Sequence, residues 1–163
     1  MRVRQDGFTL IELMVTLAIA AILAVVGVPA FQETIKNNRM TTLGNQTLGA
    51  LMYARMEAVK RGGDVSIGQR TAGSWAGGTV VWINPDSDAI VDPGEEVLRL
   101  WDALPTNNTL VSAGAKTVFI FNASGFVDLA DTLTICDDRT AEKGLSIKIG
   151  LTGLIFIEDV TCS

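Results

Sequence analysis

A long uncharged run near the N-terminus dominates the hydrophobic pattern of this chain. The 19 residues 13–31 carry no charge, and most of them are apolar. About 20 apolar residues are enough for an α-helix to cross the hydrocarbon core of a bilayer. Arg2 and Arg4 precede the run, and a basic flank of this kind is retained in the cytoplasm. The pattern therefore predicts one membrane-spanning helix, with the rest of the chain on the outer side.

The apolar positions of residues 32–61 recur with helical spacing. Side chains three and four positions apart share one face of an α-helix, so this spacing predicts that the helix continues with one wide buried stripe. Gly62 and Gly63 follow, and glycine commonly ends a helix. The expected stripe consists of Leu43, Thr47, Leu48, Leu51, Met52, Ala54, Met56, Ala58 and Val59.

Beyond Gly63 the pattern changes to short runs of β-branched and aromatic residues separated by turn residues. Such runs predict strands, and the pairs Ser124-Gly125 and Thr152-Gly153 predict the tips of hairpins. The expected strands cover residues 65–67, 79–83, 97–101, 117–121, 133–136, 145–149 and 154–157. The expected fold class is therefore α+β, with a long N-terminal helix packed on an antiparallel β-sheet head.

Three tryptophans fall in this second part of the chain. Trp82 and Trp101 lie within expected strands, which predicts that both belong to the core of the head. Trp75 lies among glycines, which predict a flexible loop at this position.

Composition narrows the chemistry of the head. The chain has no histidine, which removes the usual general base, proton shuttle and metal ligand. Nucleophile motifs and phosphate-binding loops are missing from the sequence too. The sequence therefore predicts a structural protein and not an enzyme.

Cys136 and Cys162 both lie in the part expected outside the membrane. An even pair of cysteines in an oxidising compartment favours a disulfide, here one that ties down a C-terminal strand. Two free thiols are the alternative.

The head is acidic. From residue 64 onward the chain has 6 Lys or Arg and 14 Asp or Glu, which is a net charge of 6 − 14 = −8. Because affinity for nucleic acid rests on neutralising phosphates, this balance disfavours a nucleic-acid partner.

Glu12 lies inside the apolar part of the chain, where a carboxylate is costly. An acid near the centre of a membrane helix costs roughly 2.5–3.5 kcal/mol, so such a residue usually has a function. One interpretation is a signal anchor with Glu12 near the membrane surface, and the other is a processing site followed by an assembly signal. Gly27 and Pro29 predict a helix kink near the end of the run, because proline lacks the N–H of the helix ladder.

The sequence Gly7-Phe8-Thr9-Leu10-Ile11-Glu12-Leu13 resembles the class III signal of type IV pilins and type II secretion pseudopilins. The resemblance implies cleavage after Gly7 by a prepilin peptidase and methylation of the new N-terminal Phe8. A free α-amine is mostly cationic at neutral pH, and a buried carboxylate needs a partner. We therefore expect Glu12 of one subunit to pair with the Phe8 amine of the next.

The same resemblance implies a division of the chain into four parts. These are a cleaved leader peptide over residues 1–7, a membrane and assembly helix over 8–31, an amphipathic helix over 32–63, and a periplasmic β head over 64–163. It also implies that the helix bends or locally unwinds at Pro29 as it leaves the bilayer.

Residues 51–62 read LMYARMEAVKRG and are similar to the LxxARxEAxxRG helix end of the GspH/FimT family of minor pilins and pseudopilins. Residues 135–139 and the Thr152-Gly153 hairpin resemble the C-terminal half of that family. The resemblance implies a minor pilin in the bacterial inner membrane that primes or caps assembly of a type IV pilus, with its final place at or near the tip. Implied partners are other minor pilins, the major subunit and the prepilin peptidase. The alternative is an H-type minor pseudopilin of a type II secretion system, acting in protein export.

Some FimT-type relatives bind DNA through a Gly-Arg-x-Arg pattern in the C-terminal hairpin. Here Gly153 is followed by Leu154 and Phe156 in place of the two arginines. Together with the acidic head, this difference disfavours a role in DNA uptake.

An acidic segment of the head has the spacing of a calcium-binding loop. Asn84, Asp86, Asp88, Asp92 and Glu95 fall at positions 1, 3, 5, 9 and 12 of an EF-hand-type loop, which ligates calcium through oxygen atoms. Position 6 lacks the glycine that the sharp turn requires, and the first ligand is Asn instead of Asp. We therefore expect a solvated acidic loop without a cofactor, with calcium as the alternative.

Overall fold

A computed structural model describes residues 7–84, 86, 88, 91–139 and 141–162 of the chain. The expected leader therefore lies outside the described residues, except for Gly7. The chain divides into two compact units, Met1–Asn38 and Arg39–Ser163.

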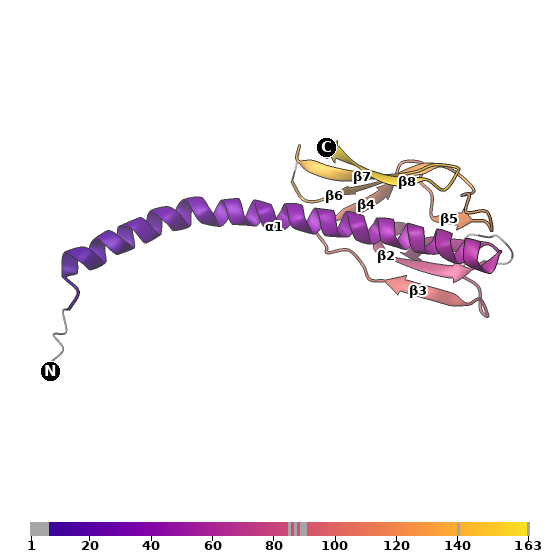
Figure 1. Ribbon diagram of the computed structural model, residues 1–163, viewed down its shortest axis with the longest axis horizontal. Helices are drawn as coiled ribbons and strands as arrows, with labels where there is room; N and C mark the ends of the chain where they lie inside the picture. The colour runs from indigo at the N-terminus through magenta and orange to yellow at the C-terminus, as the bar shows by residue number, and fades with distance from the viewer. Residues whose placement is uncertain (1–6, 85, 87, 89–90, 140, 163) are drawn as a thin grey trace. The chain divides into compact units, whose positions relative to one another are not determined.

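One helix, α1, runs from Leu10 to Arg61 (Figure 1). In the first unit, every residue from Gly7 to Ala24 is exposed, and this part of α1 is long and apolar enough to cross a membrane. The helix continues through Gly27 and Pro29 without a break. The local unwinding that the resemblance implied is therefore absent, because the loss of one N–H donor is tolerated when the adjacent turns keep their bonds. A kink without unwinding stays a prediction.

The end of α1 follows the expectation from the glycine pair. Gly62 has a positive φ of 69°, and the N–H groups of Gly62 and Gly63 both donate to the carbonyl oxygen of Ala58, at 2.9 and 3.3 Å. A left-handed residue of this kind satisfies the last carbonyl groups of a helix and turns the chain away.

Two four-stranded antiparallel sheets form the second unit with the C-terminal part of α1 (Figure 1). The first sheet has the order β3-β2-β1-β5, formed by Val97–Trp101, Ser74–Ile83, Val65–Thr71 and Val118–Phe121. The second has the order β4-β6-β7-β8, formed by Thr109–Ser112, Asp131–Cys136, Lys143–Ile149 and Ile155–Thr161. The predicted α+β class is confirmed, and β4 is the strand that the sequence reading missed.

The hydrophobic core joins α1 to both sheets. The buried residues of α1 include Leu51, Ala54 and Ala58, which pack with Ile67 and Phe119 of the first sheet and with strand residues of the second. Two alanines on this face leave room for the sheets to approach the helix closely. The core therefore depends on one narrow side of α1.

Only part of the stripe expected on α1 is buried. Met52, Met56 and Val59 are 45%, 61% and 53% exposed, and Leu48 is half-buried. These residues lie on a neighbouring face of the helix that neither sheet covers. Helical spacing shows which residues share a face, but the width of the covered face depends on how the sheets are placed.

The tryptophans follow expectation in part. Trp82 is buried as expected, in a small separate core cluster with Val80 and Val118. Trp101 is half-buried and packs against the main core. Trp75, expected in a flexible loop, is 2% exposed within β2, and its Nε1 donates to the carbonyl oxygen of Lys116 at 2.6 Å. The surrounding glycines belong to a paired hairpin in which Thr71 faces Ser74.

Candidate functional site

The segment that carries the expected cleavage site is exposed and not helical. Gly7, Phe8 and Thr9 precede α1 without regular structure, and Phe8 is 84% exposed. A Cβ added to Gly7 would meet nothing within 4 Å. The fold of this chain therefore does not itself require glycine at position 7, so any such requirement comes from an enzyme that recognises it.

Thr9 and Glu12 bond each other at the start of α1. The backbone N–H of Glu12 donates to Thr9 Oγ1 at 3.3 Å, and the backbone N–H of Thr9 donates to Glu12 Oε2 at 3.5 Å. The first helical backbone bond, from Leu13 N to Thr9 O at 3.2 Å, begins at the same residue. This reciprocal pair is a capping box, which satisfies two of the N–H groups that a helix start leaves without partners.

The sequence reading named Glu12 and missed Thr9. A threonine three residues before a glutamate at the beginning of an apolar run is the signal that would have found the pair. Among the residues that the structure describes, no ion pair involves Glu12. The structure therefore shows the Glu12 carboxylate bonded to the backbone of its own chain.

At the other end of α1, Arg55 connects three segments of the head. Its Nε donates to the carbonyl oxygen of Gly125 at 3.0 Å, and its Nη2 donates to that of Thr152 at 3.4 Å. A Cβ added to Gly153 would lie 2.0 Å from the Gly125 oxygen and 2.6 Å from Arg55 Nε. The two predicted turn tips, 124–125 and 152–153, thus meet on the arginine of the helix-end motif.

Glu57 of the same motif is buried and binds two cations of its own helix. Arg61 Nε lies 2.8 Å from Glu57 Oε2, and Lys60 Nζ lies 3.3 Å from Oε1. The hydrogen bond from Arg61 holds the pKa of the Glu57 carboxyl below its ordinary value of 4.5, while burial acts in the opposite direction. Arg61 also reaches Glu96 of the β2–β3 connection at 3.5 Å. The motif therefore fastens the helix end to the first sheet.

The cysteines form the expected disulfide. Cys136 at the end of β6 is joined to Cys162, their Cα atoms are 5.9 Å apart, and Cys162 is 6% exposed. Gly144 lies against the bridge, because a Cβ there would be 2.3 Å from Cys162 Sγ. The bridge ties the end of the C-terminal strand β8 to β6, which is two strands away in the same sheet.

The hairpin between β7 and β8 exposes apolar side chains. Leu151, Leu154 and Phe156 are 56%, 61% and 39% exposed. Lys148 lies over the ring of Phe156 and pairs with Glu158 at 2.5 Å. The expectation that nucleic acid is not a partner stays a prediction.

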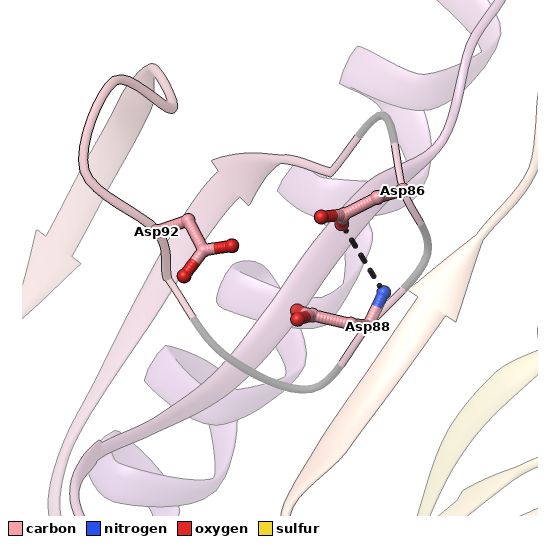
Figure 2. A group of neighbouring side chains, drawn as sticks. All are labelled: Asp86, Asp88 and Asp92. Atoms are coloured by element: carbon pink, nitrogen blue, oxygen red, sulfur yellow. Dashed lines mark hydrogen bonds between the residues drawn. The ribbon is translucent and has the colours of Figure 1, made fainter.

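The acidic loop after β2 brings three carboxylates together. Oxygens of Asp86, Asp88 and Asp92 lie within 4.8 Å of one another, and their side chains face the inside of one loop (Figure 2). Asp88 N donates to Asp86 Oδ1 at 3.4 Å. Calcium takes six to eight oxygen ligands, so three carboxylates bound through one oxygen each would supply only part of such a set.

The two other residues of the expected calcium set serve the loop itself. The fully buried Asn84 donates from its amide to Ser66 Oγ and to the Asp88 carbonyl oxygen, at 2.7 and 2.6 Å. Glu95 Oε2 accepts from the backbone N–H of Asp92 at 2.7 Å. The structure therefore supports a self-bonded acidic loop, and calcium stays an alternative that it does not test.

One hollow of the head lies between α1 and the β3–β4 connection. Its polar lining among the described residues comes mainly from Arg39, Thr42, Gln46, Thr47 and Asp102. This set contains neither a nucleophile beside a base nor a pair of carboxylates, so the hollow presents none of the usual catalytic arrangements.

Two family models match this chain. The prokaryotic N-terminal methylation motif matches residues 2–28, and the type II transport protein GspH family matches residues 43–153. The second match covers more than half of the chain, so the chain belongs to the GspH family, within the type IV pilin-like minor pilins and pseudopilins. Proteins of these families are structural.

Individual relatives are pilins. The type IV major fimbrial protein FimA of Dichelobacter nodosus is 34% identical over 107 residues, which are 64% of this chain and 67% of that protein. Prepilin peptidase-dependent protein D of Escherichia coli is 48% identical over 40 residues, 24% of this chain, and the match spans only 27% of that relative.

The fold is also that of a pilin. The crystal structure of the type IV minor pilin FimU of Pseudomonas aeruginosa matches with a TM-score of 0.65 and 24% identity, over 76% of this chain and 90% of FimU. A second crystal form of FimU matches with a TM-score of 0.61 and 25% identity, over 72% and 91% of the two chains. The long N-terminal helix followed by antiparallel sheets is thus shared with a known minor pilin.

Proposed function

We propose that this chain is a minor pilin that primes or caps assembly of a type IV pilus. In this proposal a prepilin peptidase cuts after Gly7 and methylates Phe8, and Glu12 then pairs with the N-terminal amine of a neighbouring subunit. The observation that carries it is the start of α1, where an exposed Gly7–Phe8 bond lies four residues before a carboxylate that bonds only backbone among the described residues. Pairing removes two isolated charges at once, which favours assembly in a medium of low dielectric constant.

The surroundings of Glu12 support this proposal. Residues 13–25, which follow it, are all exposed, and this apolar surface suits first a bilayer and then the helices of other subunits. In the proposal the head lies in the periplasm, as the oxidised cysteine pair of the second unit supports. The partners are other minor pilins and the major subunit.

The test replaces Glu12 in the full chain. Glu12→Val should still be cleaved and inserted into the inner membrane, but it should be missing from sheared pili. Glu33→Val, which removes an exposed acid of α1 outside the motif, is the matched control and should assemble. Normal assembly of Glu12→Val would refute the pairing.

Cleavage is tested separately. Gly7→Ala should be processed to a large extent and Gly7→Leu should not. The chain has space for a side chain at position 7, whereas in this proposal the peptidase accepts only a small one. The measurement is the size of the membrane-bound protein on a gel, where the retained leader slows migration. A processed Gly7→Leu protein would contradict the proposed cleavage site.

A second candidate is an H-type minor pseudopilin of a type II secretion system, favoured by the family model that matches residues 43–153. Deleting the gene and scoring surface pili, secreted proteins and DNA uptake in parallel separates the two. Loss of pili with normal secretion supports the minor pilin, whereas loss of secretion with intact pili supports the pseudopilin.

A further inference from the structure

Two polar side chains without partners line the hollow between α1 and the β3–β4 connection. Arg39 and Gln46 project into its lining from one face of α1, and both residues are exposed. Neither side chain has a hydrogen bond or an ion pair with another described residue. Because breaking a bond inside the chain is costly, these two free groups are the ones that a bound molecule can use at the lowest cost.

The hollow has the size and the lining of a small binding site. Its volume is about 430 Å³, within the range of roughly 300–1,000 Å³ that is common for ligand sites. Its apolar lining includes the buried Leu43 and Leu110 and the half-buried Leu104. Leu43 lies between Arg39 and Gln46 along the helix, so the hollow has room for an apolar side chain between the two polar groups.

Contacts within the head fix the wall of the hollow opposite α1. Leu104 N donates to the carbonyl oxygen of Ala76 at 2.8 Å. Gly78 approaches the connection so closely that a Cβ there would lie 2.6 Å from the carbonyl oxygen of Trp101. The α1 wall is held by the main core, to which Leu51 belongs. The hollow is therefore formed before a ligand binds, and binding has little chain entropy to overcome on the side of the protein.

We propose that this hollow binds the C-terminal carboxylate of an extended peptide segment. The planar guanidinium of Arg39 suits a carboxylate, which accepts two parallel N–H bonds from it. The Gln46 amide offers a donor and an acceptor, which a peptide group matches. Asp102, an acid of the same lining, pairs with Arg70 at 3.3 Å, and this pairing weakens its repulsion of a bound carboxylate.

The spacing of the two polar groups fits the end of an extended chain. Arg39 and Gln46 are seven residues apart, which is about 10 Å along a helix axis, and three extended residues span about 10 Å as well. A terminal carboxylate continues the line of an extended backbone, whereas an acidic side chain projects sideways from it. A chain end therefore reaches Arg39 while its peptide group three residues earlier reaches Gln46.

The test uses the full chain in nanodiscs of a zwitterionic lipid, because free detergent would enter an apolar hollow. The probe is the acetylated tripeptide Ac-Leu-Ala-Leu with a free carboxylate, and its C-terminal amide is the matched ligand without the charge. Calorimetry should show that the free acid binds at least about tenfold more tightly, since a hydrogen bond to a charged group is stronger than a neutral one. The ¹³C-methyl resonances of Leu43, Leu104 and Leu110 should move, which places the peptide in this hollow.

Variants of the cation test its role. Arg39→Gln should abolish the preference for the acid and leave binding of the amide unchanged. Its melting temperature should stay that of the wild type, because the Arg39 side chain bonds no other described residue. Arg39→Lys should keep part of the preference, since an ammonium group lacks the planar fork. Lys143→Gln is the control, because Lys143 is 80% exposed and pairs with Asp159 elsewhere in the head, and it should keep the full preference.

Several outcomes would overturn this inference. They are equal binding of acid and amide by the wild type, a preference that survives in Arg39→Gln, and no heat or methyl shift at about 10 mM peptide, where a Kd of about 1 mM would be visible. Equally tight binding of Ac-Leu-Glu-Leu amide would assign the hollow to acidic side chains and overturn the role of a chain end. None of these measurements depends on cleavage or on Glu12, so the proposed function is tested separately.

Discussion

Arg55 Nε donates a hydrogen bond of 3.0 Å to the carbonyl oxygen of Gly125, which is 70 residues further along the chain. This bond connects the helix to the turn after β5, and the second donor of the same guanidinium reaches the β7–β8 hairpin through Thr152. One side chain of the helix-end motif thus ties α1 to a turn of each sheet. These contacts of Arg55 stabilise the head, and no local sequence pattern predicts them.

Removing this guanidinium should destabilise the head. Arg55→Gln should lower the free energy of unfolding by about 2 kcal/mol, because two carbonyl groups lose a charged donor. Arg55→Lys should recover only part of it, since an ammonium group cannot reproduce two directed N–H bonds. Denaturant unfolding of the full chain in detergent measures the difference. Lys60→Gln, whose side chain is 72% exposed, is the control and should change little.

Two features restrict position 153 to glycine: a positive φ and the lack of space for a Cβ. Gly62 and Gly153 both have positive φ, of 69° and 74°, but a Cβ meets nothing within 4 Å at Gly62 and lies 2.0 Å from a backbone oxygen at Gly153. Gly62→Ala should therefore cost about 1–2 kcal/mol from backbone strain alone. Gly153→Ala should cost about 3 kcal/mol or more, because overlap with the backbone adds to that strain. Equal shifts of the melting temperature would show that crowding at Gly153 is not important.

Glu57 should make the head sensitive to acid. Because Arg61 lowers the pKa of Glu57 in the folded state, the carboxylate stabilises the fold above its ordinary pKa near 4.5, and this stabilisation is lost as pH falls through the lower folded value. Glu57→Gln should therefore be less stable than the wild type at pH 7, and the difference should be smaller at pH 3. Chemical denaturation at both pH values measures this.

The control for the acid dependence is Glu142→Gln, which removes an exposed carboxylate of the same head. It should leave the difference between pH 7 and pH 3 close to that of the wild type. A Glu57→Gln protein with unchanged pH dependence would contradict the role assigned to the Arg61 bond.

The disulfide should contribute measurably to the stability of the head. It closes a loop with a sequence separation of 26 residues, and a loop of this size corresponds to about 3 kcal/mol in the chain-entropy model. The Cys136→Ala/Cys162→Ala protein should unfold at correspondingly lower denaturant concentration. Gly144→Ala should hinder formation of the bridge, because its Cβ would overlap Cys162 Sγ, and a thiol assay on the unfolded protein would then find free cysteine.

Calcium should have no effect on the acidic loop. Three carboxylates converge there, whereas Asn84 and Glu95 bond the loop backbone. We expect no heat in a calcium titration and no change in melting temperature with millimolar calcium. A thermal shift that disappears in Asp88→Asn would contradict this and would establish a calcium site.

Local patterns in the sequence predicted most helices and strands of this fold. The uncharged run predicted the apolar part of α1, the glycine pair predicted the end of the helix at Arg61, and runs of β-branched residues predicted most strands within a few residues. The elements that escaped, β4 and the strand position of Trp75, are those stabilised by neighbours. Trp75 sits among glycines, and its burial depends on Lys116 and Phe119, which are more than 40 residues away.

The residues of the candidate site also fall into those that the sequence predicted and those that it did not. Gly7, Phe8 and Glu12 were predicted because they form a contiguous motif, and Thr9 was missed although its three-residue spacing to Glu12 was visible. The partners of Arg55 had no signal in the sequence, because backbone carbonyl groups look the same at every position.

The sequence by itself determined the apolar helix, its charge at Glu12, the processing motif and the family, since these depend on residue types at short spacing. Only the tertiary structure decided which side of α1 is covered, leaving Met52, Met56 and Val59 exposed. It also decided that Arg55, Gly125 and Gly153 meet and that Asn84 bonds to Ser66 and to the backbone of Asp88. The physical reason is that burial and hydrogen bonding between distant segments depend on how two sheets pack on one helix, and no periodicity along the chain contains that placement.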